Sequence, residues 1–219
     1  MSTPTHHRDN LSIDQALALR TAAVRLSDTF RDMFGTETIE RFLHSSYDEF
    51  AGRAVVLNSL PLLAERFARQ RLAALARVEG RGGDGVPVVL FLCTHNAGRS
   101  QMALGFFTAL AGDKAVGWSG GSVPGTSINP AAIAAMAEVG IDIGGEFPKP
   151  WTDEVVQAAD VVITMGCGDT CPVFPGRRYQ EWTIADPDAL TVDDIRPIRD
   201  EIQRRVRALV TELVPAMPA

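Results

Sequence analysis

The sequence predicts an α/β protein with a four-stranded parallel sheet flanked by helices, preceded by a small three-helix bundle. Up to residue 79, apolar residues recur at steps of three and four, the period of an amphipathic helix. From residue 86 onwards, short apolar runs alternate with helical patterns, as in a parallel sheet with helices on both faces. Residues 80–85, G-R-G-G-D-G, are typical of a flexible linker. We therefore expect a bundle over 1–79, a linker over 80–85 and an α/β domain over 86–219.

Three amphipathic helices are predicted in the bundle. The first has an apolar face from Ala16 to Met33, and the second is expected to be capped by Thr36. The third begins near Pro61, a residue that a first helical turn tolerates. The segment has no cysteine, and His44 is interpreted as a helix-surface residue. We therefore predict an interaction or oligomerisation module, such as one that forms a homodimer, and no catalytic role.

The α/β domain is expected to contain four strands and four helices. The strands are predicted at 86–92, 115–119, 160–165 and 179–184, and the helices at 101–111, 130–139 and 152–159, with a long helix that follows the cap residue Thr191. Ligands of such sheets bind beyond the carboxyl ends of the strands. Cys93 and Cys167 both lie at such ends.

Cys93 ends an apolar strand and opens a tight loop that leads directly into a helix. The predicted oxyanion-binding residues that follow it are Thr94, His95, Asn96, Ala97, Gly98, Arg99 and Ser100. Main-chain N–H groups of such a loop, together with a helix N-terminus, can surround a tetrahedral oxyanion. A thiolate in this field is the nucleophile. Arg99 can hold two oxyanion oxygens with its planar fork, and Ser100 can donate a hydrogen bond to the sulfur.

A structural interpretation of Cys93 is the alternative, because a cysteine at a strand end is often only a small buried residue. The full order of strand, Cys, five residues, Arg-Ser and helix favours a thiol site that attacks a phosphate-like anion. His95, within this loop, is expected to be an exposed residue.

Cys167 and Cys171 lie four residues apart in a loop rich in glycine. Such thiols can approach to disulfide distance, and an intracellular disulfide is usually transient and catalytic. Thiol–disulfide exchange would then pass oxidation from one sulfur to the next. A zinc site and two inert thiols are the alternatives, but no further Cys or His pair completes a zinc site. We favour a redox pair and predict no metal and no cofactor.

Asp186 precedes Pro187 after the last predicted strand. Proline holds the preceding residue in an extended conformation, so Asp186 can face the oxyanion loop and protonate a leaving oxygen as a general acid. Asp-Pro-Asp alone is more often a plain turn, and Asp188 keeps that interpretation.

Composition limits the function classes. The 219 residues carry 21 Lys and Arg against 27 Asp and Glu, a net charge of −6, with no basic stripe, which argues against nucleic-acid binding. No apolar stretch is long enough to span a bilayer, and the first residues lack a signal-peptide core. Three cysteines do not form a secreted disulfide framework. We expect a cytoplasmic protein without a membrane partner.

The segment from Cys93 to Ala103 resembles the phosphate-binding loop of low-molecular-weight protein tyrosine phosphatases, and more closely that of the arsenate reductases that share their fold. Further matching segments are Ser119-Gly120-Gly121, Asn129-Pro130-Ala131, Gly140-Ile141-Asp142 and Asp186-Pro187. The resemblance covers residues 86–214. The bundle lies outside it, although some bacterial arsenate reductases carry such a helical extension.

The resemblance implies a three-cysteine relay for arsenic detoxification. Cys93 attacks arsenate, for which phosphate and sulfate are mimics, and Asp186 helps water to leave. Cys167 then attacks Cys93, releasing arsenite, and Cys171 attacks Cys167. The resulting Cys167–Cys171 disulfide is reduced by a thioredoxin-like or mycothiol-based partner.

Several residues depart from the family pattern. Gln101 stands where phosphatases usually have proline, and residues 188–190 lack the tyrosines that hold an aromatic substrate there. Leu104 replaces a glutamate of a cation site, so no potassium is predicted. Asn96 matches the family asparagine and is expected to hold the loop in an unusual backbone conformation.

Three functions are therefore in competition. The leading one is an arsenate reductase. The second is a phosphatase for phosphotyrosine or small phosphate esters, because the nucleophile, arginine and acid are of the same kind. The third is a non-catalytic sensor whose thiols only report redox state.

Overall fold

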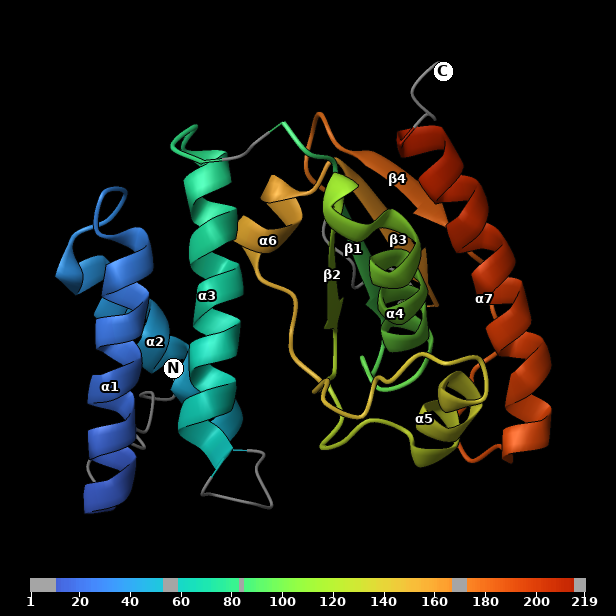
Figure 1. Ribbon diagram of the computed structural model, residues 1–219, viewed down its shortest axis with the longest axis horizontal. Helices are drawn as coiled ribbons and strands as arrows, with labels where there is room; N and C mark the ends of the chain where they lie inside the picture. Colours follow the sequence, from blue (N-terminus) through green and yellow to red (C-terminus); the bar gives the residue numbers. More distant parts are fainter. Residues whose placement is uncertain (1–10, 53–58, 83–84, 167–172, 215–219) are drawn as a thin grey trace. The chain divides into compact units, whose positions relative to one another are not determined.

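The computed structural model describes residues 11–52, 59–82, 85–166 and 173–214. The chain divides into two compact units, residues 1–83 and 84–219 (Figure 1). Within the described ranges, no helix is both long enough and apolar enough to cross a membrane.

The first unit contains the three predicted helices: α1 (Ile13–Phe30), α2 (Thr36–Ala51) and α3 (Leu60–Val78). A capping box starts α1, since Ser12 Oγ accepts from the Gln15 N–H and Gln15 Oε1 accepts from the Ser12 N–H. The prediction that Thr36 caps α2 is wrong. Gly35 is the extended N-cap residue and Thr36 is the first helical residue. Which residue of a Gly-Thr pair caps depends on where the chain turns, and residue type alone does not decide that.

The three helices bury their apolar faces against one another. Leu26, Leu43 and Phe67 are fully buried, one from each helix. Glu65 of α3 is buried as well, and it accepts hydrogen bonds from Arg25 of α1. The bond from Arg25 holds the pKa of the Glu65 carboxyl below its usual value, because it stabilises the ionised form. This pair joins α1 to α3 at the edge of the bundle core, since the Arg25 side chain is 52% exposed.

A four-stranded parallel sheet forms the centre of the second unit, in the order β2-β1-β3-β4. Its strands are β1 (Val88–Cys93), β2 (Val116–Gly121), β3 (Val161–Met165) and β4 (Arg178–Glu181). All six residues of β1 are buried, as expected of a central parallel strand. The register pairs Cys93 with Gly121 on one side and with Met165 on the other. Cys93 therefore lies at the carboxyl edge of the sheet, between its two neighbouring strands.

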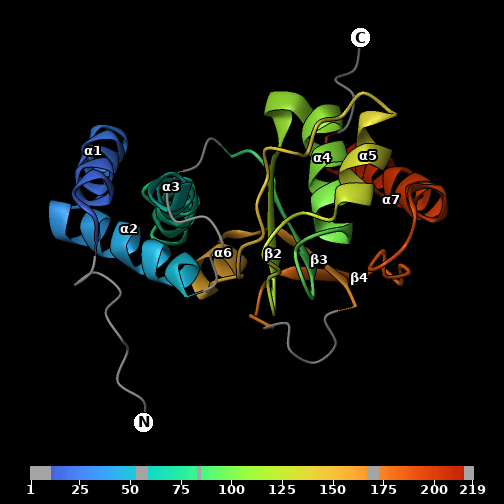
Figure 2. The same ribbon diagram turned by 90° about the horizontal axis from the view of Figure 1, so that it is seen from below.

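Helices cover both faces of this sheet. The elements are α4 (Arg99–Ala111), the short 3₁₀-helix η3 (Gly112–Lys114), α5 (Pro130–Ala137), α6 (Asp153–Ala158) and α7 (Val192–Leu213). Figure 2 shows α6 on one face and α4, α5 and α7 on the other. The prediction of a parallel sheet flanked by helices is confirmed, although α4 begins two residues earlier than predicted. Arg99 and Ser100 thus form the first turn of α4.

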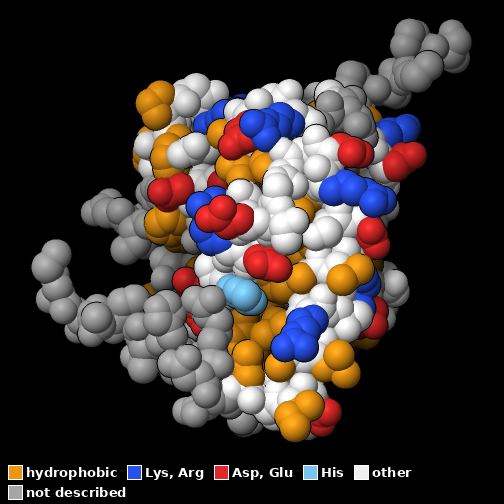
Figure 3. Space-filling model, turned by 90° about the vertical axis from the view of Figure 1, so that its left-hand side faces the viewer, with side chains coloured by type: hydrophobic (Ala, Val, Ile, Leu, Met, Phe, Trp, Pro, Cys, Tyr) orange, Lys and Arg blue, Asp and Glu red, His pale blue; other side chains and the backbone are white. Residues whose placement is uncertain are grey.

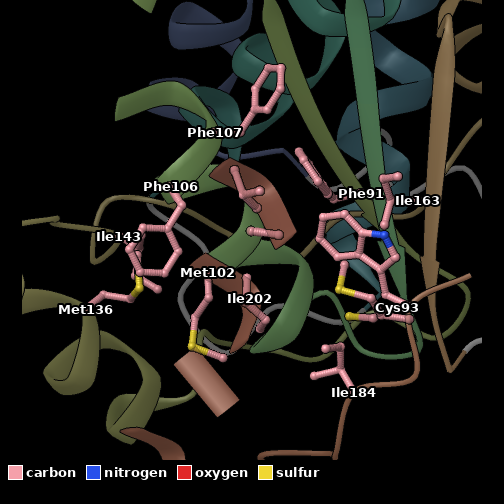
Figure 4. Close-up of a cluster of buried hydrophobic side chains, with 14 of the residues drawn as sticks. Phe91, Cys93, Met102, Phe106, Phe107, Met136, Ile143, Ile163, Ile184 and Ile202 are labelled. Atoms are coloured by element: carbon pink, nitrogen blue, oxygen red, sulfur yellow. The ribbon is translucent and has the colours of Figure 1, made fainter. Parts of the chain in front are cut away.

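The core of the second unit extends to the edge that carries Cys93. Phe91 packs edge-on against Phe107 of α4, with ring centroids 5.5 Å apart. Ile202 of α7 belongs to the same cluster and is fully buried. Figure 4 shows these side chains together with Cys93. Because β1 and α4 are both anchored in this core, the loop that joins them starts and ends on rigid supports.

Candidate active site

The loop between β1 and α4 turns sharply at Asn96. This residue has a φ of 49°, a conformation that L-residues other than Asn and Asp seldom adopt, as expected from the sequence. Its side chain is fully buried. The Asn96 Oδ1 atom accepts from the main-chain N–H of Lys149 at 2.9 Å and from Gln101 Nε2 at 3.1 Å. Asn96 therefore fixes the loop to α4 and to the segment after α5.

Ser100 links Asn96 to the cysteine. The Cys93 Sγ and Ser100 Oγ atoms are 3.0 Å apart, and Asn96 Nδ2 donates to the same Oγ at 2.8 Å. Since the amide of Asn96 occupies one lone pair of the hydroxyl oxygen, the Ser100 proton is available to the sulfur. This arrangement suits a thiolate, which accepts the hydrogen bond.

Arg99 extends from the first turn of α4 across the carboxyl edge of the sheet, and its side chain is buried. Its Nη2 donates to Asp186 Oδ2 at 2.6 Å, and its Nη1 donates to the Ile184 carbonyl oxygen at 3.3 Å. A Cβ atom at Gly166, which follows β3, would lie 2.8 Å from Nη1. Gly166 also has a φ of +73°, a conformation that favours glycine.

Asp186 is brought to the oxyanion loop by the residue that follows it. Pro187 is buried against Gly98, where a Cβ atom would lie only 2.5 Å from the proline Cγ. The Asp186 side chain remains 48% exposed beside Arg99. Asp188 donates its main-chain N–H to Asp186 Oδ1, which is the turn predicted for it. A hollow of about 40 Å³ is lined by Cys93, His95, Ala97, Gly98, Arg99, Asn129, Asp186, Pro187 and Asp188.

The structure thus brings together the predicted nucleophile, the arginine and the acid, and leaves His95 exposed at the rim. Cys167 and Cys171 lie outside the described residues. The nearest described residue before them is Gly166, whose carbonyl oxygen accepts from Thr94 Oγ1 of the oxyanion loop at 3.0 Å. The chain therefore enters the segment with these two cysteines from a point bonded to the loop.

A family model described as low molecular weight phosphotyrosine protein phosphatase matches residues 88–217. The chain belongs to this family. A second model, described as the N-terminal domain of protein-tyrosine-phosphatase-like proteins, matches residues 19–76. The family resemblance predicted from the residues around Cys93 and Asp186 is confirmed.

Individual relatives in this phosphatase family carry the name arsenate reductase. The chain is 35% identical over 128 residues to the glutaredoxin arsenate reductase of Synechocystis, a match that covers 57% of this chain and 97% of that protein. It is 37% identical over 130 residues to the arsenate reductase of Halalkalibacterium halodurans, covering 55% and 92% respectively. A solved structure of the thioredoxin-dependent arsenate reductase of Corynebacterium glutamicum is 41% identical, with a TM-score of 0.80, and the match covers 91% of this chain and 97% of that one.

Two residues that hold the oxyanion loop of this low-molecular-weight phosphatase family member were not predicted from the sequence. Lys149 was not noticed, and Gln101 was given no role. Lys149 is 3% exposed; its Nζ donates to Ser119 Oγ at 3.2 Å, and its main-chain N–H donates to Asn96 of the loop. Its only sequence signal is its position between two prolines, which is weak. Gln101, noted only as a departure, donates from Nε2 to the Asn96 carbonyl oxygen at 3.1 Å, a bond that the usual proline cannot make.

Proposed function

We propose that this chain reduces arsenate to arsenite, with Cys93 as the nucleophile. The observation that carries the proposal is the convergence of Cys93, Arg99 and Asp186 on one small hollow. The named relatives support arsenate as the substrate.

The first step forms a bond between sulfur and arsenic. The Cys93 thiolate attacks arsenate while main-chain N–H groups and the Arg99 guanidinium stabilise its oxygens. An As–O bond breaks, and the oxygen leaves as water with a proton from Asp186. Because Asp186 pairs with Arg99 in the structure, arsenate competes with this carboxylate for the guanidinium. The Asp186 carboxylate released in this way takes up the proton that the Cys93 thiol gives up and passes it to the leaving oxygen.

The remaining steps move two electrons from sulfur to arsenic. Cys167 attacks the Cys93 sulfur, so that an S–S bond forms, the S–As bond breaks, and its electron pair stays on arsenic, which leaves as arsenite. Cys171 attacks Cys167, which regenerates the Cys93 thiolate and leaves a Cys167–Cys171 disulfide. A dithiol reductant then returns the two electrons. The bond between Thr94 and Gly166 supports this relay, since it keeps the start of the cysteine segment beside the oxyanion loop.

The relay is tested by a map of disulfides after one turnover. Purified protein receives arsenate without reductant, and cleaved peptides are analysed by mass spectrometry. The unmodified chain should release one arsenite and accumulate Cys167–Cys171, whereas Cys171→Ser should stop at Cys93–Cys167. Absence of arsenite from the unmodified chain, with hydrolysis of aryl phosphates that survives Cys167→Ser and Cys171→Ser, would instead establish a phosphatase.

The electron donor is proposed to be a thioredoxin-like dithiol. A Cys167–Cys171 disulfide needs two thiols for its reduction, and the similar Corynebacterium enzyme is thioredoxin-dependent by name. Thioredoxin with its reductase should sustain repeated turnover. Turnover with mycothiol and mycoredoxin but not with thioredoxin would contradict this assignment.

The first unit is proposed to form a homodimer through α1. Leu17 and Val24 of this helix are each 61% exposed. Val24 lines a groove of about 570 Å³ between α1 and α2. The groove also carries Arg20 and the oppositely charged Asp28 and Glu40, so the same groove on a second copy can pair with it. Figure 3 shows hydrophobic side chains gathered on this side of the molecule. Analytical ultracentrifugation should give a dimer that Leu17→Glu dissociates, and a monomeric unmodified chain would refute the assignment.

A further inference from the structure

Asn129 connects three parts of the second unit. It is the N-cap residue of α5, and its Oδ1 accepts from the main-chain N–H groups of Ala131 and Ala132. Its own main-chain N–H donates to the carbonyl oxygen of Ala97, in the oxyanion loop, at 2.9 Å. Its Nδ2 donates to the carbonyl oxygen of Pro187 at 2.9 Å. One residue therefore joins a helix, the oxyanion loop and the segment that carries Asp186.

The segment around Asp186 has few other supports. Asp186, Asp188 and Leu190 are exposed. Pro187 rests on Gly98, and its carbonyl oxygen accepts from the Leu190 N–H at 3.3 Å, a bond within the same turn. Among the described residues, Asn129 supplies the only side-chain hydrogen bond to the Pro187 carbonyl oxygen. This bond comes from outside the turn. It links positions 58 residues apart in the chain.

The bond from Asn129 matters most once the substrate is bound. Before that, Asp186 is also held by Arg99, at 2.6 Å. When an oxyanion occupies the Arg99 fork, that ion pair is lost, and the position of Asp186 depends on Pro187 and on what holds Pro187. A displacement of a catalytic group by about 1 Å can cost about a hundredfold in rate.

We infer that Asn129 is a positioning residue, which holds the general acid Asp186 over the oxyanion loop while arsenate occupies Arg99. The inference rests on the proposed arsenate reductase function. Asn129 does not touch the reacting atoms. It acts through the Pro187 carbonyl oxygen. The two hydrogen bonds that its Oδ1 accepts fix the amide so that Nδ2 faces that oxygen.

Two substitutions at position 129 remove the donor and keep the helix cap. Asn129→Asp has the same shape and an acceptor for the cap, but it has no N–H group and adds a negative charge. Asn129→Ser also caps α5, is neutral, and is too short to reach Pro187. A loss shared by both variants reports the missing donor, whereas a loss confined to Asn129→Asp reports charge repulsion of arsenate and would refute the inference.

The readout is the rate of arsenite release in a single turnover at saturating arsenate. Asp186→Asn should lower this rate by about a hundredfold, the usual scale of general acid catalysis. Asn129→Ser should lower it about tenfold, with little change in the arsenate concentration for half-maximal rate. In the Asp186→Asn background, Asn129→Ser should have less than about a twofold effect, because residues that act through one group are not additive.

Other results of these measurements would refute the positioning role of Asn129. A full tenfold loss in both backgrounds would show that Asn129 only supports the fold, and an unchanged rate for Asn129→Ser would refute the positioning role. Hydrogen exchange gives a readout without catalysis: the peptide that contains Leu190 should exchange faster in Asn129→Ser than in the unmodified chain, and equal exchange would contradict the inference. If the unmodified chain releases no arsenite, the proposed function itself fails. If it does release arsenite but Asp186→Asn is as fast, Asp186 is not the general acid and only the inference about Asn129 fails.

Discussion

Replacement of Asn96 by alanine should destabilise the second unit by an amount that the structure allows us to work out. The side chain is fully buried and joins three groups: Ser100 Oγ, Gln101 Nε2 and the N–H of Lys149. In Asn96→Ala, the buried N–H of Lys149 loses this acceptor, which costs about 1–3 kcal/mol. The lost bond to Ser100 costs about 1 kcal/mol more.

The backbone contributes a separate penalty. Asn96 has a φ of 49°, which alanine adopts at an additional cost of about 1 kcal/mol, whereas glycine adopts it freely. The total for Asn96→Ala is about 3–5 kcal/mol. This is a large part of the roughly 5–15 kcal/mol by which a domain is stable. Asn96→Gly loses the same hydrogen bonds without the backbone strain and should be about 1 kcal/mol less destabilised.

Urea unfolding followed by tryptophan fluorescence can measure this effect in the second unit alone. All three tryptophans, Trp118, Trp151 and Trp182, lie in residues 84–219, so the first unit is silent in this signal. With a urea dependence of about 2 kcal/mol per M, Asn96→Ala should lower the unfolding midpoint by about 2 M. A shift below about 0.5 M, or equal shifts for the alanine and glycine variants, would refute the reasoning.

Three further predictions follow from other contacts. Asp186→Asn removes the carboxylate that competes for Arg99, so phosphate should bind more tightly by calorimetry while arsenate turnover falls; weaker binding would contradict the competition. Hydrogen bonds from Arg196 hold the pKa of Glu138 at about 2, so this carboxylate adds stability above pH 4.5 that is lost as the pH falls towards 2. Between pH 4.5 and pH 2, the unfolding midpoint should vary less with pH in Glu138→Gln than in the unmodified chain. An equal pH dependence in the two proteins would contradict this prediction. Ile202→Ala, in the core between α7 and the sheet, should cost about 2–5 kcal/mol in urea unfolding, and a loss below about 1 kcal/mol would mean that the core refills the cavity.

The sequence by itself determined what depends on neighbours along the chain. The period of apolar residues predicted the helices and the four parallel strands, because each element must bury one face or both. The order of Cys93, five residues, Arg99 and a helix predicted the oxyanion loop. This was possible because the loop consists of eight consecutive residues, 93–100, and Asn96 supplies its left-handed turn. The family resemblance rested on these same local segments.

Only the tertiary structure decided which distant residues support that loop. Arg99 and Asp186 are 87 residues apart, Asn129 and Pro187 are 58 apart, and Asn96 and Lys149 are 53 apart. These pairs meet because the strand order β2-β1-β3-β4 brings the carboxyl ends of different strands to one edge, and no local period encodes that order. Lysine and asparagine are ordinary surface and turn residues by type, so their roles follow from burial and from the partners that folding provides.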